Sequence, residues 1–202
     1  MKILPATALF AALAVCLPAI AQMPGAPDRA RVQAGRYTVD PNHTQVLWTV
    51  NHLGISPLSG AFGASGGSLQ IDPRNLSAAK VSVTFNVAEM STTSGGFTKH
   101  LSSADFFEVA KHPTATFVST SVQPKGNAAT IRGNLTIKGI TRPVTLDATF
   151  FGAGVNERSK KTNIGFSGTA SIKRSEFGLG MAVPVVADRV DLRIHAAFEQ
   201  AG

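Results

Sequence analysis

Cysteine is almost absent from this sequence: the one cysteine among 202 residues is Cys16, inside an apolar N-terminal stretch. Lys2 precedes that stretch and the small residues of Ala19-Ile20-Ala21 end it, so we predict that residues 1–21 are a signal peptide cleaved near Ala21. Val15 stands where a lipid-modified cysteine needs a small neighbour, which disfavours an acyl anchor. Cleavage would leave neither disulfide bonds nor thiol chemistry. The sequence therefore predicts a periplasmic or secreted protein held together by its hydrophobic core.

Long apolar runs and blocks of charge are also lacking. After residue 21, no stretch of the sequence is long and apolar enough to be a membrane-spanning helix. The formal net charge is +7, but no run of consecutive basic residues is longer than the pair Lys160-Lys161, so nucleic acid is not an expected partner. Solubility explains the positive excess, and transient attraction to an anionic membrane surface is the alternative.

The residue types that catalyse reactions or bind metal ions in other proteins form no catalytic or metal-binding pattern in this sequence. There is no H-E-x-x-H motif and no pair of histidines at i, i+2 or i, i+4, so we predict no metal site. Residues 63–67 match G-x-S-x-G around Ser65, but that motif needs a turn between a strand and a helix, and strands are predicted on both sides. No glycine-rich loop leads into a helix, so no nucleotide cofactor is expected. The five histidines are His43, His52, His100, His112 and His195.

Alternation of apolar and polar residues dominates the chain after its first 36 residues. Residues 80–89 alternate most regularly, and residues 45–52 place four side chains on a single face, namely Val46, Trp48, Val50 and His52. Residues 114–122 alternate too weakly to show which face is buried. We predict eight or nine strands, each with one apolar face. Closing such strands into a barrel pairs every edge and buries every apolar row.

The expected fold is therefore all-β, a closed barrel of eight or nine antiparallel strands with one short helical plug. We place a single domain at residues 36–200 and expect residues 22–35, which are rich in Pro, Gly and Ala, to be a flexible lead-in. The plug is expected between Phe97 and Ala110, where alternation stops and Ser and Asp residues can cap helical turns. Residues 54–67 are expected to form a short strand, a turn and a second short strand.

Small residues interrupt the apolar faces of several predicted strands. Among the Phe, Leu and Ile residues of these faces lie Gly133, Ala148, Gly168, Ala170 and Ala196. A close-packed core would fill such positions, so we infer an apolar slot between the strands. The alternative is that phenylalanine rings swing across and fill it. Each buried methylene contributes ~0.8 kcal/mol, so an open slot would favour a long hydrocarbon chain.

The predicted ligand contacts form a tube and its closure. The tube is expected to be lined by Trp48, Val50, Phe85, Val87, Leu135, Ile137, Leu146, Phe150, Phe166 and Ile172. Its closed end is expected to be formed by Phe97, Leu101, Phe106 and Phe177. Candidates for a polar anchor are His52, Lys99, His100, Asp105 and Arg174. Of these, His52 and His100 are counted among the predicted ligand-binding residues, and fixing the plug is the main role expected of His100 and Asp105.

Six groups of residues match a known family in order along the chain: Tyr37-Thr38-Val39-Asp40 with His43-Thr44, Val50-Asn51-His52 with Gly54, Gly60-Ala61-Phe62, residues 100–107 with His112-Pro113, residues 133–144, and residues 174–178. Through these segments the sequence resembles the YceI-like family of polyisoprenoid-binding, lipocalin-like proteins. The resemblance implies an extended eight-stranded antiparallel lipocalin-like barrel, periplasmic or secreted, that holds an isoprenoid or fatty-acyl chain in its lumen without chemistry. The family usually has Arg-Asp two residues before the His-Leu pair, where this chain has Phe97-Thr98, which implies a less polar or a different ligand end.

The function expected from the sequence is binding and carrying of a long-chain apolar lipid. A polyisoprenoid, an isoprenoid quinone and a fatty-acyl compound all fit the expected lumen. The lipid would be the ligand and no other cofactor is expected, in a monomer or homodimer that is not an enzyme. The alternative is an enzyme that modifies or hydrolyses such a lipid with His52 or His100 as the base.

Overall fold

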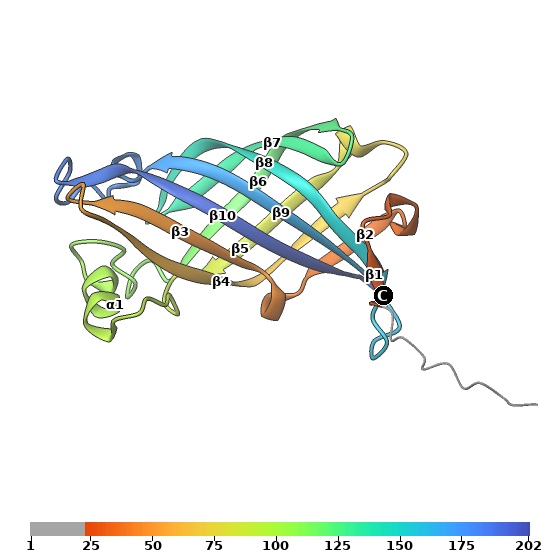
Figure 1. Cartoon of the computed structure of the whole chain (residues 1–202), viewed down its shortest axis with the longest axis horizontal. Coiled ribbons are helices and arrows are strands. Elements are labelled where there is room, and N and C mark those ends of the chain that lie inside the picture. Colours follow the sequence, from red (N-terminus) through yellow and green to blue (C-terminus); the bar gives the residue numbers. More distant parts are fainter. Residues whose placement is uncertain (1–22) are drawn as a thin grey trace, which may run out of the picture.

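The computed structural model describes residues 23–202, whose strands form a barrel (Figure 1). The predicted signal peptide at residues 1–21 lies outside the described residues. The strands are β1 (Gly25–Ala26), β2 (Gly35–Val39), β3 (Gln45–His52), β4 (Ser56–Ile71), β5 (Lys80–Asn86), β6 (Thr114–Lys125), β7 (Ala128–Ile137), β8 (Ile140–Val155), β9 (Thr162–Lys173) and β10 (Val186–Gln200). The helices are α1 (Gly95–Ser102) and four short 3₁₀ helices, η1 (Arg29–Arg31), η2 (Pro41–His43), η3 (Leu76–Ala78) and η4 (Arg174–Phe177).

The strands close into a ring of eight positions. From β4 to β10, each strand pairs antiparallel with the next one along the chain. The eighth position lies between β10 and β4 and is shared by β2 and β3, because η2 interrupts it. The predicted all-β, eight-stranded antiparallel barrel is confirmed. Closure gives the backbone groups of both sheet edges a partner, which an open sheet would leave unpaired.

The side-chain pattern of the strands follows the barrel wall. β3 has the predicted bounds, with Trp48 and Val50 buried. In β6 the register shifts between Ser119 and Ser121, so Phe117 is buried before the bulge and Val122 after it. A bulge changes which residues face inward, and this explains why the sequence of residues 114–122 alternates so weakly.

β4 is a single long strand, so the predicted strand, turn and strand over residues 54–67 is wrong. Its glycines permit close contacts instead of a turn. A Cβ atom added at Gly60 would lie 2.3 Å from Cζ2 of Trp48, whose ring therefore covers this glycine. Gly67 has a φ of +141°, and a Cβ there would lie 2.2 Å from the carbonyl oxygen of Ser82. A glycine inside a strand can therefore mark a close approach of neighbouring atoms and not a turn.

The helical segment begins earlier than the sequence indicates. Ser94 caps α1 by accepting the N–H of Phe97 at 3.3 Å, and the helix ends at Ser102. The predicted plug places helical turns as far as Ala110, whereas the chain from Ser103 forms non-helical turns and Glu108 has a φ of +49°. Among the α1 residues only Leu101 is buried. The helix lies at the end of the barrel where β3 turns into β4 (Figure 1).

The segment predicted as a flexible lead-in, residues 22–35, contains regular structure. β1 pairs with the end of β8, with Gly25 opposite Gly154. Asp28 caps η1 by accepting the N–H of Ala30 at 2.9 Å. A two-residue strand and a single helical turn are too short to produce a periodic sequence pattern, which explains the error. Within residues 23–202, no helix has both the length and the apolar content needed to cross a bilayer.

The buried side chains form two groups, one toward each end of the barrel. The group that we call the α1-end cluster includes Trp48, Leu101 and Phe177, from strands, helix and loops near α1. The second group, the far-end cluster, includes Tyr37 and Phe198. Burial raises the pKa of the Tyr37 phenol, partly offset by the bond that its O–H donates to the carbonyl oxygen of Gln33 at 2.9 Å.

Candidate functional site: an apolar cavity with one open end

An apolar cavity of about 210 Å³ lies inside the barrel between the two clusters. Members of both clusters line it, including Phe117 and Leu135 from one and Leu69 and Phe198 from the other. Side chains of the wall between them complete the lining, among them Val46, Phe85, Val122, Ile131, Leu146, Ala148, Phe150, Phe166, Leu192, Ile194 and Ala196. The polar side chains in the lining are Arg29, Thr44, Asn127 and Ser167. The buried hydroxyl of Thr44 is occupied, since it donates to the carbonyl of Ala197 at 3.1 Å.

The cavity opens at the end opposite α1. Its lining includes Pro124, Gly126, Asn127 and Ala128 at the turn between β6 and β7, all of them exposed to solvent. Figure 1 shows this turn at the far end of the barrel from α1. Leu76 and Ala79, in and beside η3, line the cavity as well. We call this opening, bordered by the β6–β7 turn, η3 and Arg29, the mouth.

Three of the five small residues expected to leave a slot do line the cavity. They are Ala148, Gly168 and Ala196. At Gly133 a phenylalanine ring fills the space, as the alternative prediction had it. The ring of Phe117 covers this glycine, and a Cβ atom added at Gly133 would lie 2.3 Å from Cζ of Phe117. Ala170 packs against the α1-end cluster instead. The slot is thus present on the β8, β9 and β10 side of the barrel and filled by an aromatic ring at β7.

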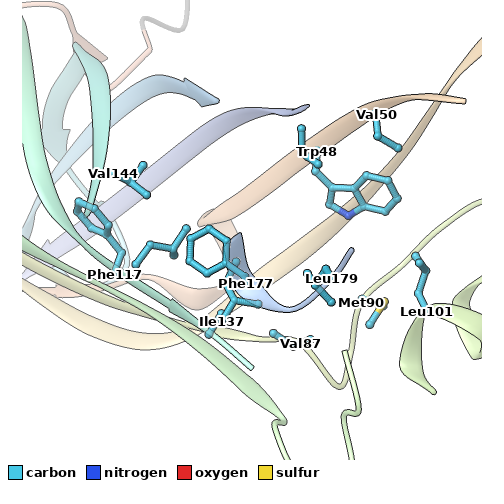
Figure 2. Packing of buried hydrophobic residues seen from close by; sticks show 13 residues of the cluster. Trp48, Val50, Val87, Met90, Leu101, Phe117, Ile137, Val144, Phe177 and Leu179 are labelled. Atoms are coloured by element: carbon cyan, nitrogen blue, oxygen red, sulfur yellow. The ribbon is translucent and has the colours of Figure 1, made fainter. Parts of the chain in front are cut away.

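The predicted ligand contacts divide between the cavity and the α1-end cluster. Five of them line the cavity: Phe85, Leu135, Leu146, Phe150 and Phe166. Nine others belong to or pack against the α1-end cluster: Trp48, Val50, Val87, Phe97, Leu101, Phe106, Ile137, Ile172 and Phe177. Figure 2 shows how several of these, with Met90 and Leu179, lie together in that cluster. Their contact with a ligand stays a prediction, since they fill the closed end of the barrel and do not line the cavity.

The two histidines proposed as ligand contacts also lie near α1. His52 ends β3, opposite Val186 of β10, and is partly buried. His100 is exposed in α1, where its ring packs edge-on against Phe106 with 4.9 Å between ring centroids. Neither side chain lines the cavity. Among the described residues there is no group of three His, Cys, Asp or Glu side chains arranged to hold a metal ion.

Arg174, a candidate anchor for a ligand, instead holds a loop of the protein. Its side chain is 7% exposed and donates to four backbone carbonyls. Nε donates to Ala187 at 2.9 Å, Nη2 to Val186 at 2.8 Å, and Nη1 to Met181 at 2.8 Å and to Leu179. The anchor hypothesis is therefore wrong for this residue, because its hydrogen-bonding groups are directed at its own chain.

The charge of Arg174 is balanced nearby. Burial lowers the pKa of its guanidinium, and the carboxylate of Asp188 opposes that effect. The pKa of Asp188 is itself lowered: burial acts to raise it, but the O–H and N–H donors of Ser175 and the charge of Arg174 outweigh burial. The lowered pKa keeps the Asp188 carboxylate ionised at neutral pH. Arg174, Ser175 and Asp188 form a structural unit at the α1 end of the barrel.

Sequence reasoning missed Arg29 and the residues of the mouth. Leu192, Ile194 and Ala196 lie on the predicted inner face of the last strand, so periodicity indicated them without ranking them as ligand contacts. Arg29 lies in a short segment without any periodicity, and no sequence signal could have placed it beside the β6–β7 turn. Its Nη1 donates to the carbonyl oxygen of Gly126 at 2.9 Å.

Residues 37–198 match the family model described as the YceI-like domain. The chain is 40% identical over 164 residues to a UPF0312 protein of Pseudomonas paraeruginosa, covering 80% of this chain and 85% of that protein. It resembles the crystal structure of BcnA from Burkholderia cenocepacia with a TM-score of 0.68 and 28% identity, covering 79% and 98% of the two chains. A polyisoprenoid binding domain from Saccharophagus degradans, implicated in plant cell wall breakdown, has the same fold, with a TM-score of 0.61 at 11% identity and coverage of 82% and 98%.

Proposed function

Because this chain belongs to the YceI-like domain family and encloses an apolar cavity, we propose that it binds and carries a long-chain apolar lipid. The observation that carries this proposal is the cavity itself, which is lined almost entirely by aliphatic and aromatic side chains and opens at one end. A polyisoprenoid, an isoprenoid quinone and a fatty-acyl compound share the required chemistry, a hydrocarbon chain without charge along its length. We place this activity in the periplasm or outside the cell, following the predicted signal peptide.

The dimensions of the cavity support a hydrocarbon guest. Its volume of about 210 Å³ exceeds the roughly 150 Å³ of an engineered apolar cavity that stays dry and binds benzene. About ten buried methylenes would contribute ~8 kcal/mol before the entropic costs of binding, which corresponds to a micromolar Kd. An apolar cavity holds water poorly, because water finds no hydrogen-bond partners there. A lipid chain is the guest that such a space favours.

A chain longer than the cavity has two routes. It can extend through the mouth past the β6–β7 turn, or it can displace side chains of the α1-end cluster, where the sequence predicts further contacts. The first route requires no rearrangement of buried groups. The second replaces contacts between Trp48, Leu101 and Phe177 by contacts with the ligand, so it exchanges one set of apolar contacts for another. The mouth is therefore the entry that we favour.

An enzyme acting on the same lipid is supported less well by the geometry. His52 and His100, the proposed bases, lie outside the cavity lining, and a base must come within hydrogen-bond reach of the group it deprotonates. Ser65 of the G-x-S-x-G segment lies exposed within β4, with its Oγ 3.4 Å from the carbonyl oxygen of Thr84. It lacks the strained turn that presents a nucleophile.

We expect Ser65→Ala to leave both lipid binding and stability unchanged, because the hydroxyl is at the surface and outside the cavity. The measurement compares hydrolysis of a long-chain ester, lipid affinity and the melting temperature of the two proteins. Ester hydrolysis by the unmodified protein that disappears in Ser65→Ala would restore the hydrolase hypothesis.

The carrier function is tested by native mass spectrometry of the protein purified from its exported fraction, followed by organic extraction. We expect a bound species that is released by denaturation and identified as an unmodified long-chain lipid. Offered prenyl and acyl compounds should be recovered chemically unchanged after incubation. A protein that carries no lipid and takes none up from vesicles would contradict the proposal, and a converted compound would favour the enzyme.

A further inference from the structure

Among the described residues that line the cavity, Arg29 is the single charged one. It belongs to η1, and the pairing of β1 with β8 places this segment at the mouth. Within residues 23–202 its guanidinium forms one hydrogen bond, from Nη1 to Gly126. A guanidinium has five N–H donors, so four of them have no partner in that part of the chain and can bind a group at the mouth. The apolar cavity, as the described residues line it, thus has a cation with spare donors at its opening and at no other point of its wall.

The charges around the mouth leave this cation uncompensated. The two carboxylates of the neighbouring short segments are each paired, Asp28 with Arg31 at 3.7 Å and Asp72 with Arg74 at 3.2 Å. Lys80 and Lys125 are the chain neighbours of lining residues. Within residues 23–202, neither these lysines nor Arg29 has an ion pair within 4 Å. The local field is therefore positive and attracts an anion.

We infer that Arg29 binds the anionic end of the lipid whose chain occupies the cavity, so that the ligand is an amphiphile ending in a carboxylate or phosphate. This inference rests on the proposed function. A planar guanidinium matches the oxygens of either group with two parallel hydrogen bonds. With the chain in the cavity, the polar end emerges at the β6–β7 turn, where Arg29 and Asn127 lie.

The anchor lies outside the part of the chain that matches the family model, because Arg29 precedes residues 37–198. Its position depends on a hydrogen bond to the β6–β7 turn and on two residue pairs between β1 and β8. The hydrogen bond is exposed, whereas Ala153, the partner of Ala26, is 2% exposed, so the pairing of β1 with β8 holds the segment beside the mouth. The anionic end of a bound ligand would add a further contact to this segment through Arg29.

The test compares Arg29→Gln with Arg158→Gln in the mature protein. Arg158 is an exposed arginine in the turn between β8 and β9 that does not line the cavity and has no ion pair within residues 23–202, so it controls for general surface charge. The probes are matched in chain and differ in their end: hexadecanoate and hexadecanol, and farnesyl phosphate and farnesol. Affinities are measured at neutral pH and low salt, because an exposed ion pair is screened by salt.

We expect Arg29→Gln to weaken binding of the two anionic probes by about tenfold, the factor that corresponds to losing one charge-assisted hydrogen bond. The two alcohols should bind with unchanged affinity, Arg158→Gln should bind all four probes normally, and Arg29→Lys should recover part of the loss. Equal losses for acids and alcohols, equal losses in Arg29→Gln and Arg158→Gln, or no loss would each overturn the anchor.

Two further results distinguish a free anion from the anionic end of a lipid, and a failure of the Arg29 anchor from a failure of the lipid-binding function. Tight binding of inorganic phosphate alone that depends on Arg29 would assign the site to a free anion and overturn the anchor. If the unmodified protein binds neither the acids nor the alcohols, the lipid-binding function itself fails. Acids and alcohols that bind equally well would contradict only the anchor.

Discussion

Ala148→Phe is expected to weaken lipid binding about a hundredfold while the barrel stays folded. Ala148 faces the cavity from the middle of β8. Benzene fills an apolar cavity of roughly 150 Å³, so a phenyl ring added at residue 148 would occupy most of the about 210 Å³ available here. Displacing about four methylenes of the guest removes ~3 kcal/mol, a loss of about a hundredfold in affinity. The measurement is lipid retention by native mass spectrometry, with circular dichroism and thermal unfolding recorded on the same sample.

The matched control is Thr149→Phe, the same substitution one residue later. Thr149 is exposed on the outer face of β8, so a ring there leaves the cavity open. We expect it to bind lipid normally. Gly168 would be a poorer site for the filling substitution, because its Cβ would lie 3.3 Å from the carbonyl oxygen of Asp147 and would press on the backbone. Undiminished lipid binding by a folded Ala148→Phe would show that the ligand lies elsewhere.

Strand periodicity was sufficient to predict the barrel. The alternation in residues 45–52 predicts the observed bounds of β3, whereas the regular alternation in residues 80–89 predicts a strand three residues longer than β5, which ends at Asn86. The reason is physical: in a closed sheet with a dry interior, alternation is a direct record of which side chains face inward. It fails where the backbone changes phase. The bulge in β6 and the close approaches at the glycines of β4 depend on contacts with neighbouring strands. No single segment of the sequence contains both partners of such a contact.

The position of the cavity was harder to predict than the fold. Small inward residues identified the wall at Ala148, Gly168 and Ala196, but whether a small residue leaves space depends on the partner across the barrel. At Gly133 that partner is Phe117, which fills the gap, and at Gly60 it is Trp48. The sequence therefore shows where space can exist and not which ring will occupy it. For the same reason, most of the residues predicted to contact the ligand belong to the packed α1-end cluster.

The mouth was unpredictable for another reason. The charged candidates chosen from the sequence lie near α1, whereas Arg29 reaches the cavity from a segment with no regular pattern. Its position follows from the pairing of β1 with β8, a contact between residues 25–26 and 153–154. Such long-range pairing of two residues leaves no trace in local composition. The cation that is best placed to select a ligand was therefore invisible before the fold was known.

Arg174→Leu is expected to lower the free energy of unfolding by about 3–5 kcal/mol, a large fraction of the stability of one domain. The substitution leaves four backbone carbonyls between residues 179 and 187 without their donor. An unpaired buried carbonyl costs about 1–3 kcal/mol, and part of this is recovered where the loop can admit water. Denaturant unfolding followed by tryptophan fluorescence measures the change, since Trp48 lies in the adjoining α1-end cluster.

Two companion variants separate the effect of the Arg174 hydrogen bonds on stability from the effect of its positive charge. Arg174→Lys keeps the charge, but one ammonium cannot reach carbonyls spread over this loop, so most of the loss should persist. Arg189→Leu removes an exposed arginine, 71% accessible in its pair with Asp191, and should change stability by about 1 kcal/mol or less. Phe177 and Leu179 lie at the start of the loop that Arg174 holds, and both are almost fully buried. An Arg174→Leu protein as stable as the unmodified one would mean that their packing alone keeps this end of the barrel closed.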